Sequence, residues 1–348
     1  MRLLVSALEH SANVHLSYLT KELGSNVTLT GIFDRSLGES IVDLRSTSIM
    51  GFVDVIKKLP FFFRLKDQML ELAHDADKVL LIDSSGFNLP LAKAIRKRYP
   101  DKEIIYYILP QAWAWKKKRI PVLEKTITRL CSILPFEPSY YSSNAPIEYV
   151  GHPLLDEITI RKIDLIPSGK ITFMPGSRPG EIKRLMPIYH KLRAMIDCEA
   201  LLAIPPHFTY QQIRELYGDI SAFKITHEAH QSLAESDFAF ICSGTATLEA
   251  SLIGTPFILA YIAKKLDYAI ASRLVKLDYV GLGNILFSHN YHRALHPEFL
   301  QNEVNAQNLY NAYQQMDKQQ FFNDAQALRN LLGHGSAARV SAIIKEHQ

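Results

Sequence analysis

The sequence predicts a parallel α/β protein with two domains, and three observations lead to this expectation. Short apolar runs bounded by turn residues alternate with helical patterns along the chain. Several of these runs are continuously apolar, as is typical of strands buried on both faces of a sheet. The chain has 348 residues, which is enough for two domains that each bury a core of their own.

Strands are expected wherever a short apolar run ends in turn residues. The predicted strands are Leu3–Ala7, Lys78–Ile82, Ile104–Ile108, Ser132–Leu134, Ile171–Met174, Ala200–Ile204, Phe238–Ile241 and Phe257–Ala260. A helix is predicted over Glu181–Met195, where apolar side chains recur every three or four residues, and Pro187 is expected to bend it.

A domain boundary is predicted near Val150–Pro153, where a strand-like run ends in turn residues. The last segment, Ala325–His347, has a helical pattern interrupted at Gly333–Ser336. We therefore expect a first domain over residues 1–150, a second domain over residues 151–325, and a helical tail over residues 326–348.

Composition excludes several classes of protein. Charged residues make up 21% and apolar residues 47% of the chain, and the formal net charge of +4 is too small to indicate nucleic-acid binding. The cysteines form no C-x-x-C pair, so we expect neither disulfides nor a zinc ribbon, and we expect a reduced cytoplasmic compartment.

No apolar run approaches the roughly 18 to 20 residues that cross a bilayer, so any membrane association should be peripheral. No carboxylate is spaced to complete a metal site with the histidine pairs His227 and His230 or His292 and His296, and no metal is expected.

Glycine-rich nucleotide motifs are missing from the places where they would act. A dinucleotide-binding domain needs G-x-G-x-x-G directly after a strand, but the first predicted strand continues into Leu8–Asn13, which contains no glycine. Gly333–Ala338 matches the letters G-x-G-x-x-A, yet it follows a helical pattern, and no G-x-x-x-x-G-K-[ST] is present. The sequence therefore argues against hydride transfer and against a P-loop kinase.

Two small-residue turns after predicted strands are candidate phosphate sites instead. The first contains Gly176, Ser177 and Arg178. The N–H groups at a helix start attract anions, and an arginine adds a charged contact. A capped helix with a surface arginine is the structural alternative.

The second turn contains Ser243, Gly244 and Thr245, and Glu249 follows in the helix that the turn opens. A carboxylate about one turn into such a helix can reach a ribose hydroxyl, although a solvated helix acid would look the same. Two turns of this kind in one half of the chain predict a nucleotide diphosphate site.

Two acidic residues end predicted strands in the first half of the chain. Asp83 follows the strand Lys78–Ile82, and Glu9 occupies the equivalent place after the first strand. In open α/β sheets the carboxyl ends of the strands face the ligand, and a carboxylate there can act as a general base. Capping of a helix N-terminus is the alternative role for Asp83.

Two aromatic and basic stretches are candidate lipid contacts. Phe61, Phe62 and Phe63 are consecutive, and lysine and arginine residues flank them. An apolar surface rimmed by cations can sit in the interface of an anionic membrane, whereas a stripe of core residues is the alternative. The second stretch consists of Trp113, Trp115, Lys116 and Lys117, followed by Lys118 and Arg119. The alternative for this stretch is a basic helix start whose tryptophans pack against the protein.

Together these motifs resemble the lipid-A-disaccharide synthase family over nearly the whole chain. Their order and spacing make the set specific, although several are weak singly. They are Met50–Val55, Ile82–Asn88, Gln111–Trp115 with the basic residues after it, Leu134–Glu137, Val150–Pro153, the turn Pro175–Arg178, Ser243–Thr245 with Glu249, and Leu274–Lys276 running to Asn284.

The resemblance implies a GT-B fold, in which two Rossmann-like, doubly wound halves face each other across a cleft. It implies an inverting, metal-independent transfer from UDP-2,3-diacylglucosamine to 2,3-diacylglucosamine 1-phosphate that forms a β-1′,6 link and releases UDP. Asp83 would deprotonate the acceptor hydroxyl, and Glu9 is the other candidate catalytic residue. The two phosphate turns, Glu249 and Asn284 would bind the donor. Ser11, Asn88 and the two aromatic stretches would meet the acceptor and the membrane.

The chain departs from the family pattern at two places. The family has Gly-Glu-x-Ser-Gly-Asp after the first strand, whereas this chain has Leu8 and Ala12 in place of the glycines and Asn13 in place of the aspartate. Gly86 stands where the family usually has a second aspartate, which leaves Asp83 as the main candidate base in that segment.

The expected location is the inner face of the cytoplasmic membrane, with peripheral attachment. The sequence leaves both a monomer and a homodimer open. Two other classes of function remain open as well: another GT-B enzyme that uses a UDP-sugar, such as an epimerase or a peptidoglycan-type transferase, and a non-catalytic nucleotide-binding protein at the membrane.

Overall fold

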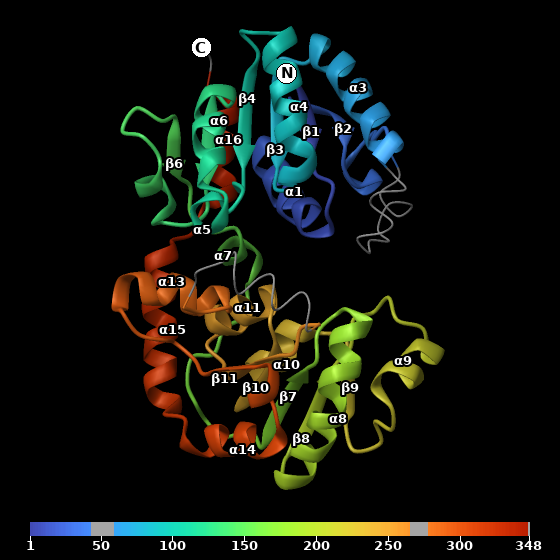
Figure 1. Ribbon diagram of the computed structural model, residues 1–348, viewed down its shortest axis with the longest axis vertical. Helices are drawn as coiled ribbons and strands as arrows, with labels where there is room; N and C mark the ends of the chain where they lie inside the picture. Colours follow the sequence, from blue (N-terminus) through green and yellow to red (C-terminus); the bar gives the residue numbers. More distant parts are fainter. Residues whose placement is uncertain (43–58, 265–277, 347–348) are drawn as a thin grey trace. The chain divides into compact units, whose positions relative to one another are not determined.

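The computed structural model describes residues 1–42, 59–264 and 278–346. These residues form two compact units, one made of Met1–Glu157 with Leu332–Gln348 and the other of Ile158–Leu331. In the described residues, each unit contains a six-stranded parallel sheet between helices (Figure 1). The prediction of two parallel α/β units is therefore confirmed. The first unit extends to Glu157, beyond the predicted boundary at residue 150.

The sheet of the first unit has the order β2-β1-β3-β4-β5-β6. Its strands are β1 (Arg2–Ser6), β2 (Thr28–Ile32), β3 (Lys78–Ile82), β4 (Glu103–Tyr107), β5 (Arg129–Ser132) and β6 (Ile147–Tyr149). Its helices are α1 (His10–Leu23), α3 (Leu59–Asp75), α4 (Ser85–Arg98), α5 (Ala112–Trp115), α6 (Ile120–Thr126), α7 (Leu154–Glu157) and α16 (Ser336–Lys345), with the short 3-10 helices η1 (Arg35–Leu37), η3 (Lys117–Arg119) and η4 (Glu137–Tyr140).

Alternation along each strand divides the first unit into two core layers. Tyr106 of β4 packs in the layer that holds the apolar side chains of α3, α4 and α6, whereas Tyr107 packs in the layer of α1 and α16. Helix α16 lies against α1, where Ser341 Oγ and Lys345 Nζ donate hydrogen bonds of 3.0 and 2.8 Å to the main-chain oxygen of Glu22. The end of the predicted tail is thus part of the core of the first unit, because its apolar face completes one layer.

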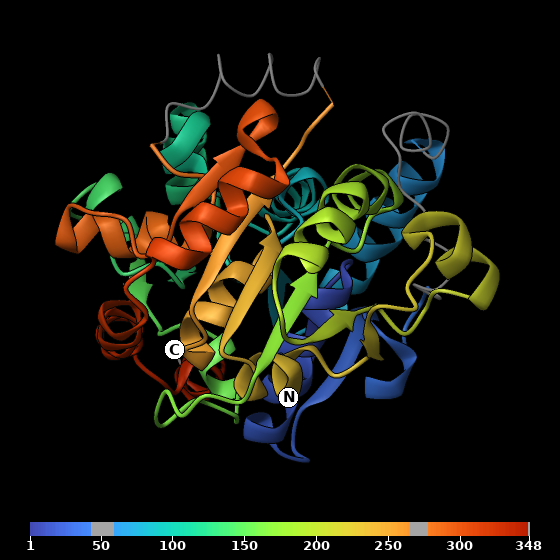
Figure 2. The ribbon, with the colours of Figure 1, turned by 90° about the horizontal axis from the view of Figure 1, so that it is seen from below.

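The sheet of the second unit has the order β12-β11-β10-β7-β8-β9, and Figure 2 shows β7, β10 and β11, coloured green to orange, side by side within it. Its strands are β7 (Lys170–Met174), β8 (Glu199–Ala203), β9 (Lys224–Thr226), β10 (Phe238–Cys242), β11 (Phe257–Tyr261) and β12 (Glu298–Leu300). Its helices are α8 (Pro179–Met195), α9 (Tyr210–Tyr217), α10 (Ala229–Glu235), α11 (Thr245–Ile253), α13 (Leu282–Tyr291), α14 (Ala306–Gln315) and α15 (Lys318–Leu332), with the 3-10 helix η5 (Gln301–Glu303).

Helices also cover both faces of this second sheet. The apolar side chains of α8, α9 and α14 pack with Ile171 and Phe173 of β7. Between them, Thr172 points the other way, and its hydroxyl donates a 3.1 Å hydrogen bond to the main-chain oxygen of Ser232 in α10. Both faces are therefore buried, as the continuously apolar strands predicted.

The predicted strands are found to within about two residues, apart from one. The prediction for β5 was wrong: Ser132–Leu134 was expected, but the strand runs from Arg129 to Ser132 and only Ser132 is shared. Four strands were not predicted at all, namely β2, β6, β9 and β12, and each of them is the edge strand of its sheet. In the described part of the chain, no helix is long and apolar enough to span a membrane.

Candidate active site

Two acidic turns of the first unit meet at the carboxyl edge of its sheet. Strands β1 and β3 pair in parallel, so Glu9, after β1, and Asp83, after β3, leave the sheet at the same edge. The hydroxyl of Ser84 donates a 3.2 Å hydrogen bond to Glu9 Oε1, which links the two turns directly. The structure therefore brings together the two residues that the sequence predicted as catalytic.

Asp83 lies in a backbone conformation that is uncommon for residues other than glycine. Asp83 and Ser84, which we call the Asp83 elbow, have φ angles of 50° and 41°. The main-chain oxygen of Asp83 accepts hydrogen bonds of 2.7 Å from the Tyr106 hydroxyl and 2.9 Å from Asn88 Nδ2. Non-glycine residues take this conformation where the surroundings impose it, and such places are often functional sites.

Asn88 supports the elbow from inside the protein. It was expected to contact the acceptor, but its side chain is fully buried. Its Oδ1 accepts a 2.6 Å hydrogen bond from Ser6 Oγ, and its Nδ2 donates to the main-chain oxygen of Ile82 at 3.1 Å as well as to Asp83. The expectation of a substrate contact is therefore corrected, because these bonds occupy the amide. Ser11, the other expected acceptor residue, is exposed on α1.

The departure from the family pattern at Asn13 also has a structural explanation. The side-chain amide of Asn13 donates hydrogen bonds of 2.8 Å to the main-chain oxygens of Ala7 and Glu9, and its Oδ1 accepts a 2.6 Å hydrogen bond from the main-chain N–H of Asp34. A deprotonated aspartate could not donate the first two bonds. Asn13 therefore fixes the turn that carries Glu9.

The surroundings of Asp83 favour its protonated form. Burial raises the pKa of the Asp83 carboxyl, and the nearby negative charge of Glu9 raises it further. A hydrogen bond from the main-chain N–H of Ser84 and the charge of His15 act in the opposite direction. His15 is itself hydrogen-bonded through Nδ1 to Glu157. Because the pKa of the carboxyl is raised, Asp83 is a stronger base than an ordinary aspartate, as deprotonation of a hydroxyl requires.

A second acid near this edge is not available to a substrate. Glu137 in η4 is only 1% exposed, and its Oε2 accepts a 2.6 Å hydrogen bond from Ser132 Oγ. Burial raises the pKa of the Glu137 carboxyl to about 7, although the hydrogen bond from Ser132 lowers this pKa. Its neighbour Phe136 packs edge-on against Trp113, with the ring centroids 4.9 Å apart. Glu137 is therefore a structural acid within an aromatic cluster.

The turn after β7 in the second unit is shaped by a glycine. Gly176 has a φ of 99°, and a Cβ at this position would lie 2.7 Å from Glu181 Oε2 and 3.1 Å from Cys242 Sγ. Glu181 is buried at the start of α8 and accepts a 3.1 Å hydrogen bond from Arg178 Nη1. The Arg178 side chain is 80% exposed, and Ser177 is exposed beside it. The turn therefore presents a cation and backbone at the surface.

The turn after β10 lies next to the turn after β7, because these two strands pair with Ile241 opposite Met174. Helix α11 begins at Thr245 after Ser243 and the exposed Gly244. In the described residues, neither α8 nor α11 has a side chain that caps its first N–H groups. The N-cap residues Arg178 and Gly244 therefore provide no side-chain cap. Helix α8 starts at Pro179, which has no N–H, and the N–H of Glu181 is bonded to the main-chain oxygen of Arg178, so the start of α8 offers an anion fewer free donors than that of α11.

Two further predicted donor residues have different surroundings. Glu249 is partly buried on α11, and its Oε2 lies 3.3 Å from His230 Nε2 of α10. Asn284 is fully buried: its Nδ2 donates to the main-chain oxygen of His296 at 2.9 Å and to Glu298 Oε1 at 2.7 Å, and its Oδ1 accepts from the main-chain N–H groups of Leu295 and His296. Asn284 thus holds the start of α13 in place, and these four bonds use its whole amide.

The aromatic residues of the predicted lipid contacts are mostly inside the first unit. Phe61 and Phe62 pack against its core, whereas Phe63 is 59% exposed and lies under Lys66 Nζ, which is 5.5 Å from its ring centroid. Trp113 is buried. The side chain of Trp115 and the segments Met50–Val55 and Leu274–Lys276 lie outside the described residues. Lys116 is partly buried, and Lys117 is exposed above the ring of Tyr140.

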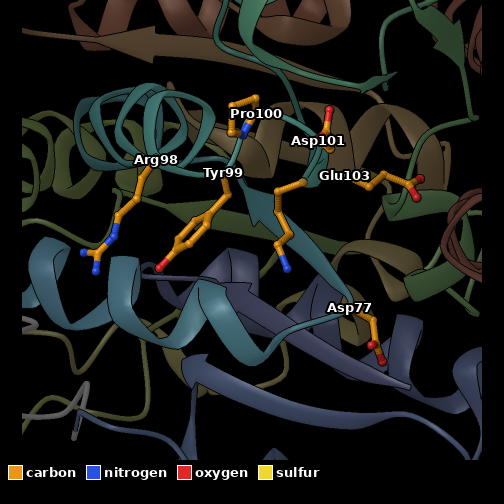
Figure 3. A pocket seen from close by; sticks show the side chains of 7 residues that line it. Asp77, Arg98, Tyr99, Pro100, Asp101 and Glu103 are labelled. Carbon is orange, nitrogen blue, oxygen red and sulfur yellow. The ribbon is translucent and has the colours of Figure 1, made fainter.

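A hollow of about 470 Å³ lies at the opposite edge of the first sheet (Figure 3). It is lined by Asp77, before β3, and by the connection from Arg98 to Glu103, before β4. Two of its charged side chains have protein partners: Arg98 pairs with Glu71, and Glu103 lies 2.8 Å from Lys78 Nζ. The hollow is therefore a weaker candidate site than the carboxyl edge.

Comparisons with known proteins agree on one family. A family profile described as lipid-A-disaccharide synthetase matches residues 3–336. Lipid-A-disaccharide synthase of Helicobacter pylori is 47% identical over 352 residues, which cover 97% of this chain and 96% of the relative. The synthase of Campylobacter jejuni is 44% identical over 370 residues and covers 99% of each chain.

Solved structures show the same fold at low sequence identity. The MurG structure of Acinetobacter baumannii has a TM-score of 0.60 at 12% identity and covers 99% of each chain. The UDP-GlcNAc 2-epimerase of Neisseria meningitidis bound to UDP-GlcNAc has a TM-score of 0.61 at 13% identity and covers 99% of this chain and 100% of the other. The fold is therefore GT-B, as the sequence resemblance implied.

Proposed function

This chain belongs to the lipid-A-disaccharide synthase family, and from that premise we propose how its residues divide the reaction. The protein is a glycosyltransferase of lipid A biosynthesis. In our proposal the carboxyl edge of the first sheet binds the acceptor, 2,3-diacylglucosamine 1-phosphate. The carboxyl edge of the second sheet binds the donor, UDP-2,3-diacylglucosamine.

Asp83 is the proposed general base. Its carboxylate accepts the proton of the acceptor 6-hydroxyl, and the oxygen attacks the anomeric carbon of the donor from the face opposite the diphosphate. The bond between that carbon and the phosphate oxygen breaks, UDP leaves, and the anomeric configuration inverts. The observation that carries this proposal is the Asp83 elbow beside Glu9, because it combines a partly buried carboxyl of raised pKa with a preorganised turn.

Departure of the diphosphate needs positive charge, which two helix starts and one arginine can supply. The start of α11 and the start of α8 after Pro179 lie at adjacent strand ends, and Arg178 adds a charge that water reaches easily. Such groups stabilise charge that develops in a transition state. We propose that they act in this way without a metal ion. Glu249 is the proposed ribose contact, and Asn284 is a positioning residue.

The proposal is tested by a product assay with both diacylated sugars, read by mass spectrometry. Asp83→Asn should lower kcat by about 10²- to 10⁴-fold, which is the usual contribution of a general base, while UDP binding measured by calorimetry stays unchanged. Asp101→Asn, at an exposed turn on the opposite edge, is the matched control. Near-normal turnover by Asp83→Asn would remove Asp83 as the base.

We also propose that the first unit binds an anionic membrane surface through Phe63 and its neighbouring cations. Phe63 extends from α3 into solvent, next to the exposed Arg64 and the partly buried Lys66. Phe61 and Phe62 cannot contribute in the same way, because they pack against the core. An aromatic ring with adjacent cations suits the headgroup region of a bilayer.

Vesicle binding tests this second part. Phe63→Ser should weaken binding to vesicles of phosphatidylethanolamine and phosphatidylglycerol by about 10-fold or more, since burial of one such ring is worth roughly 1.5–3 kcal/mol. Ile166→Ser, which removes an equally accessible apolar side chain from the second unit, should leave binding unchanged. Equal binding by both variants would show that Phe63 does not contact lipid.

A further inference from the structure

The Asp83 elbow is held from a neighbouring strand by one hydroxyl. We propose that Tyr106 is a positioning residue for the proposed base, because its hydroxyl fixes the backbone that carries the Asp83 carboxylate. This inference rests on the proposed function of Asp83. It adds a residue that the sequence did not single out, since a tyrosine within an apolar strand has the pattern of a core residue.

Unfavourable backbone is concentrated at this point of the sheet. Asp83 and Ser84 follow β3 with positive φ, and Ile108 follows β4 with a φ of 63°, which is rare for a branched side chain. The two strands are paired with Ile82 opposite Tyr107, and the main-chain N–H of Asp83 donates a 3.1 Å hydrogen bond to the main-chain oxygen of Tyr107. Such conformations persist only where neighbouring contacts impose them.

Two side chains impose the elbow through the main-chain oxygen of Asp83. Asn88 Nδ2 belongs to α4, the helix that the elbow itself opens, and it also bonds to Ile82. Tyr106 belongs to β4, so its 2.7 Å bond ties the elbow to a separate strand. Tyr106 is fully buried, and its ring packs with the core layer of α3, α4 and α6. Loss of the hydroxyl would leave the Asp83 oxygen with a single side-chain donor, Asn88 Nδ2, which belongs to the helix that the elbow opens.

The adjacent tyrosine provides a matched control. Tyr107 is also buried, in the opposite core layer, and its hydroxyl is hydrogen-bonded to Ser336 Oγ at 2.8 Å. Each Tyr→Phe change removes one buried hydroxyl and leaves the ring. Only the change at Tyr106 removes a bond to the elbow.

The experiment compares Tyr106→Phe and Tyr107→Phe in the two-sugar product assay. Tyr106→Phe should lower kcat by about 10- to 100-fold, as small misplacements of catalytic groups do, with KM for each sugar within about twofold of the wild type. Its acid limb of kcat against pH should move to lower pH, because a carboxyl released from its site regains solvent and loses the burial that raises its pKa. Both variants should lower the thermal midpoint by similar amounts, because each loses one buried hydroxyl. Tyr107→Phe should nevertheless keep the wild-type kcat and pH profile.

The outcomes separate this inference from the proposed function. If Asp83→Asn is inactive but Tyr106→Phe keeps the wild-type kcat and pH profile, the positioning role is wrong and the base stands. Equal losses of kcat in both tyrosine variants would also overturn it, because the effect would then be one of stability. Turnover by Asp83→Asn would instead overturn the proposed function. If Tyr106→Phe does not fold, the double variant Tyr106→Phe, Ser84→Gly is compared with Ser84→Gly. Glycine relieves the backbone at position 84 but not at Asp83, so a smaller loss of kcat is expected, and no loss would overturn the positioning role.

Discussion

The Asp83 elbow and the turn at Gly176 connect a buried strand to a helix in two different ways. The elbow uses Asp83 and Ser84 at positive φ and depends on hydrogen bonds from Tyr106 and Asn88. The other turn uses Gly176, which takes a φ of 99° without steric cost and leaves room for Glu181.

The difference follows from what each turn presents. A turn that displays a carboxylate cannot have glycine at that position, so its conformation has to be maintained by neighbouring side chains. A turn that presents backbone N–H groups to an anion can use glycine, and the missing Cβ lets the ligand approach. Substitutions at the two turns should therefore fail in different ways, one in catalysis and the other in binding.

Among three further substitutions at or next to these turns, Gly176→Ala should have the largest effect. The new Cβ would contact Glu181 Oε2 at 2.7 Å and Cys242 Sγ at 3.1 Å in an unfavourable φ region. We expect a loss of about 2–4 kcal/mol in the free energy of unfolding and a UDP affinity lowered by about 10-fold or more, measured by urea denaturation and calorimetry. Gly169→Ala is the control, because Gly169 also has a positive φ but no atom within 4 Å of the new Cβ. It should lose only about 1 kcal/mol of stability and keep UDP affinity. Unchanged UDP affinity in Gly176→Ala would mean that this turn does not bind the donor.

A smaller effect is expected from Arg178→Ala. The Arg178 side chain is 80% exposed, but its removal takes the 3.1 Å hydrogen bond from the buried Glu181 carboxylate, so the thermal midpoint should fall modestly. UDP affinity should fall by about 5-fold at low salt, which corresponds to about 1 kcal/mol, and the difference should shrink as salt screens the charge. Arg214→Ala, on α9 of the same unit, controls for the general loss of a positive charge. A difference from wild type that does not depend on salt would contradict an electrostatic contact.

The smallest change in rate should come from Glu9→Gln. The charge of Glu9 raises the pKa of Asp83, so a neutral side chain should let that pKa fall toward its ordinary value. More Asp83 is then deprotonated at low pH, and the acid limb of kcat should move to lower pH with kcat at neutral pH changed by less than about threefold. Glu22→Gln, an exposed acid on the same helix, should leave the profile unchanged. A large loss of kcat at every pH would instead give Glu9 a direct part in proton transfer.

The central strands of both sheets could be predicted from the sequence, whereas the edge strands could not. β10 is apolar throughout and β3 is apolar from Val79 to Ile82 because both faces are covered, so composition alone marks them. β9 and β12 are three residues long, partly exposed and mixed in polarity, and their pairing with a neighbour is what makes them strands. β5 is only four residues long and has polar residues, Arg129 and Ser132, at both ends, so composition does not mark its bounds.

The candidate site shows the same division. Asp83, Glu9 and the two phosphate turns stand out in the sequence because acidic or small residues interrupt apolar runs at strand ends. Asn88 and Asn284 carry no sign of whether they face a ligand or the interior, and the structure buries both. No pattern links Tyr106 to Asp83, which is 23 residues earlier in the chain.

The sequence by itself determined the parallel α/β class, the family and the strand ends at which chemistry is expected. These are set by local patterns and by their order along the chain. Only the tertiary structure decided which side chain supports which turn, that α16 completes the core of the first unit, and that Phe63 rather than Phe61 or Phe62 faces solvent. Burial and hydrogen bonding join residues that are distant in the chain, and alternation along a strand assigns neighbours such as Tyr106 and Tyr107 to opposite faces of the same sheet.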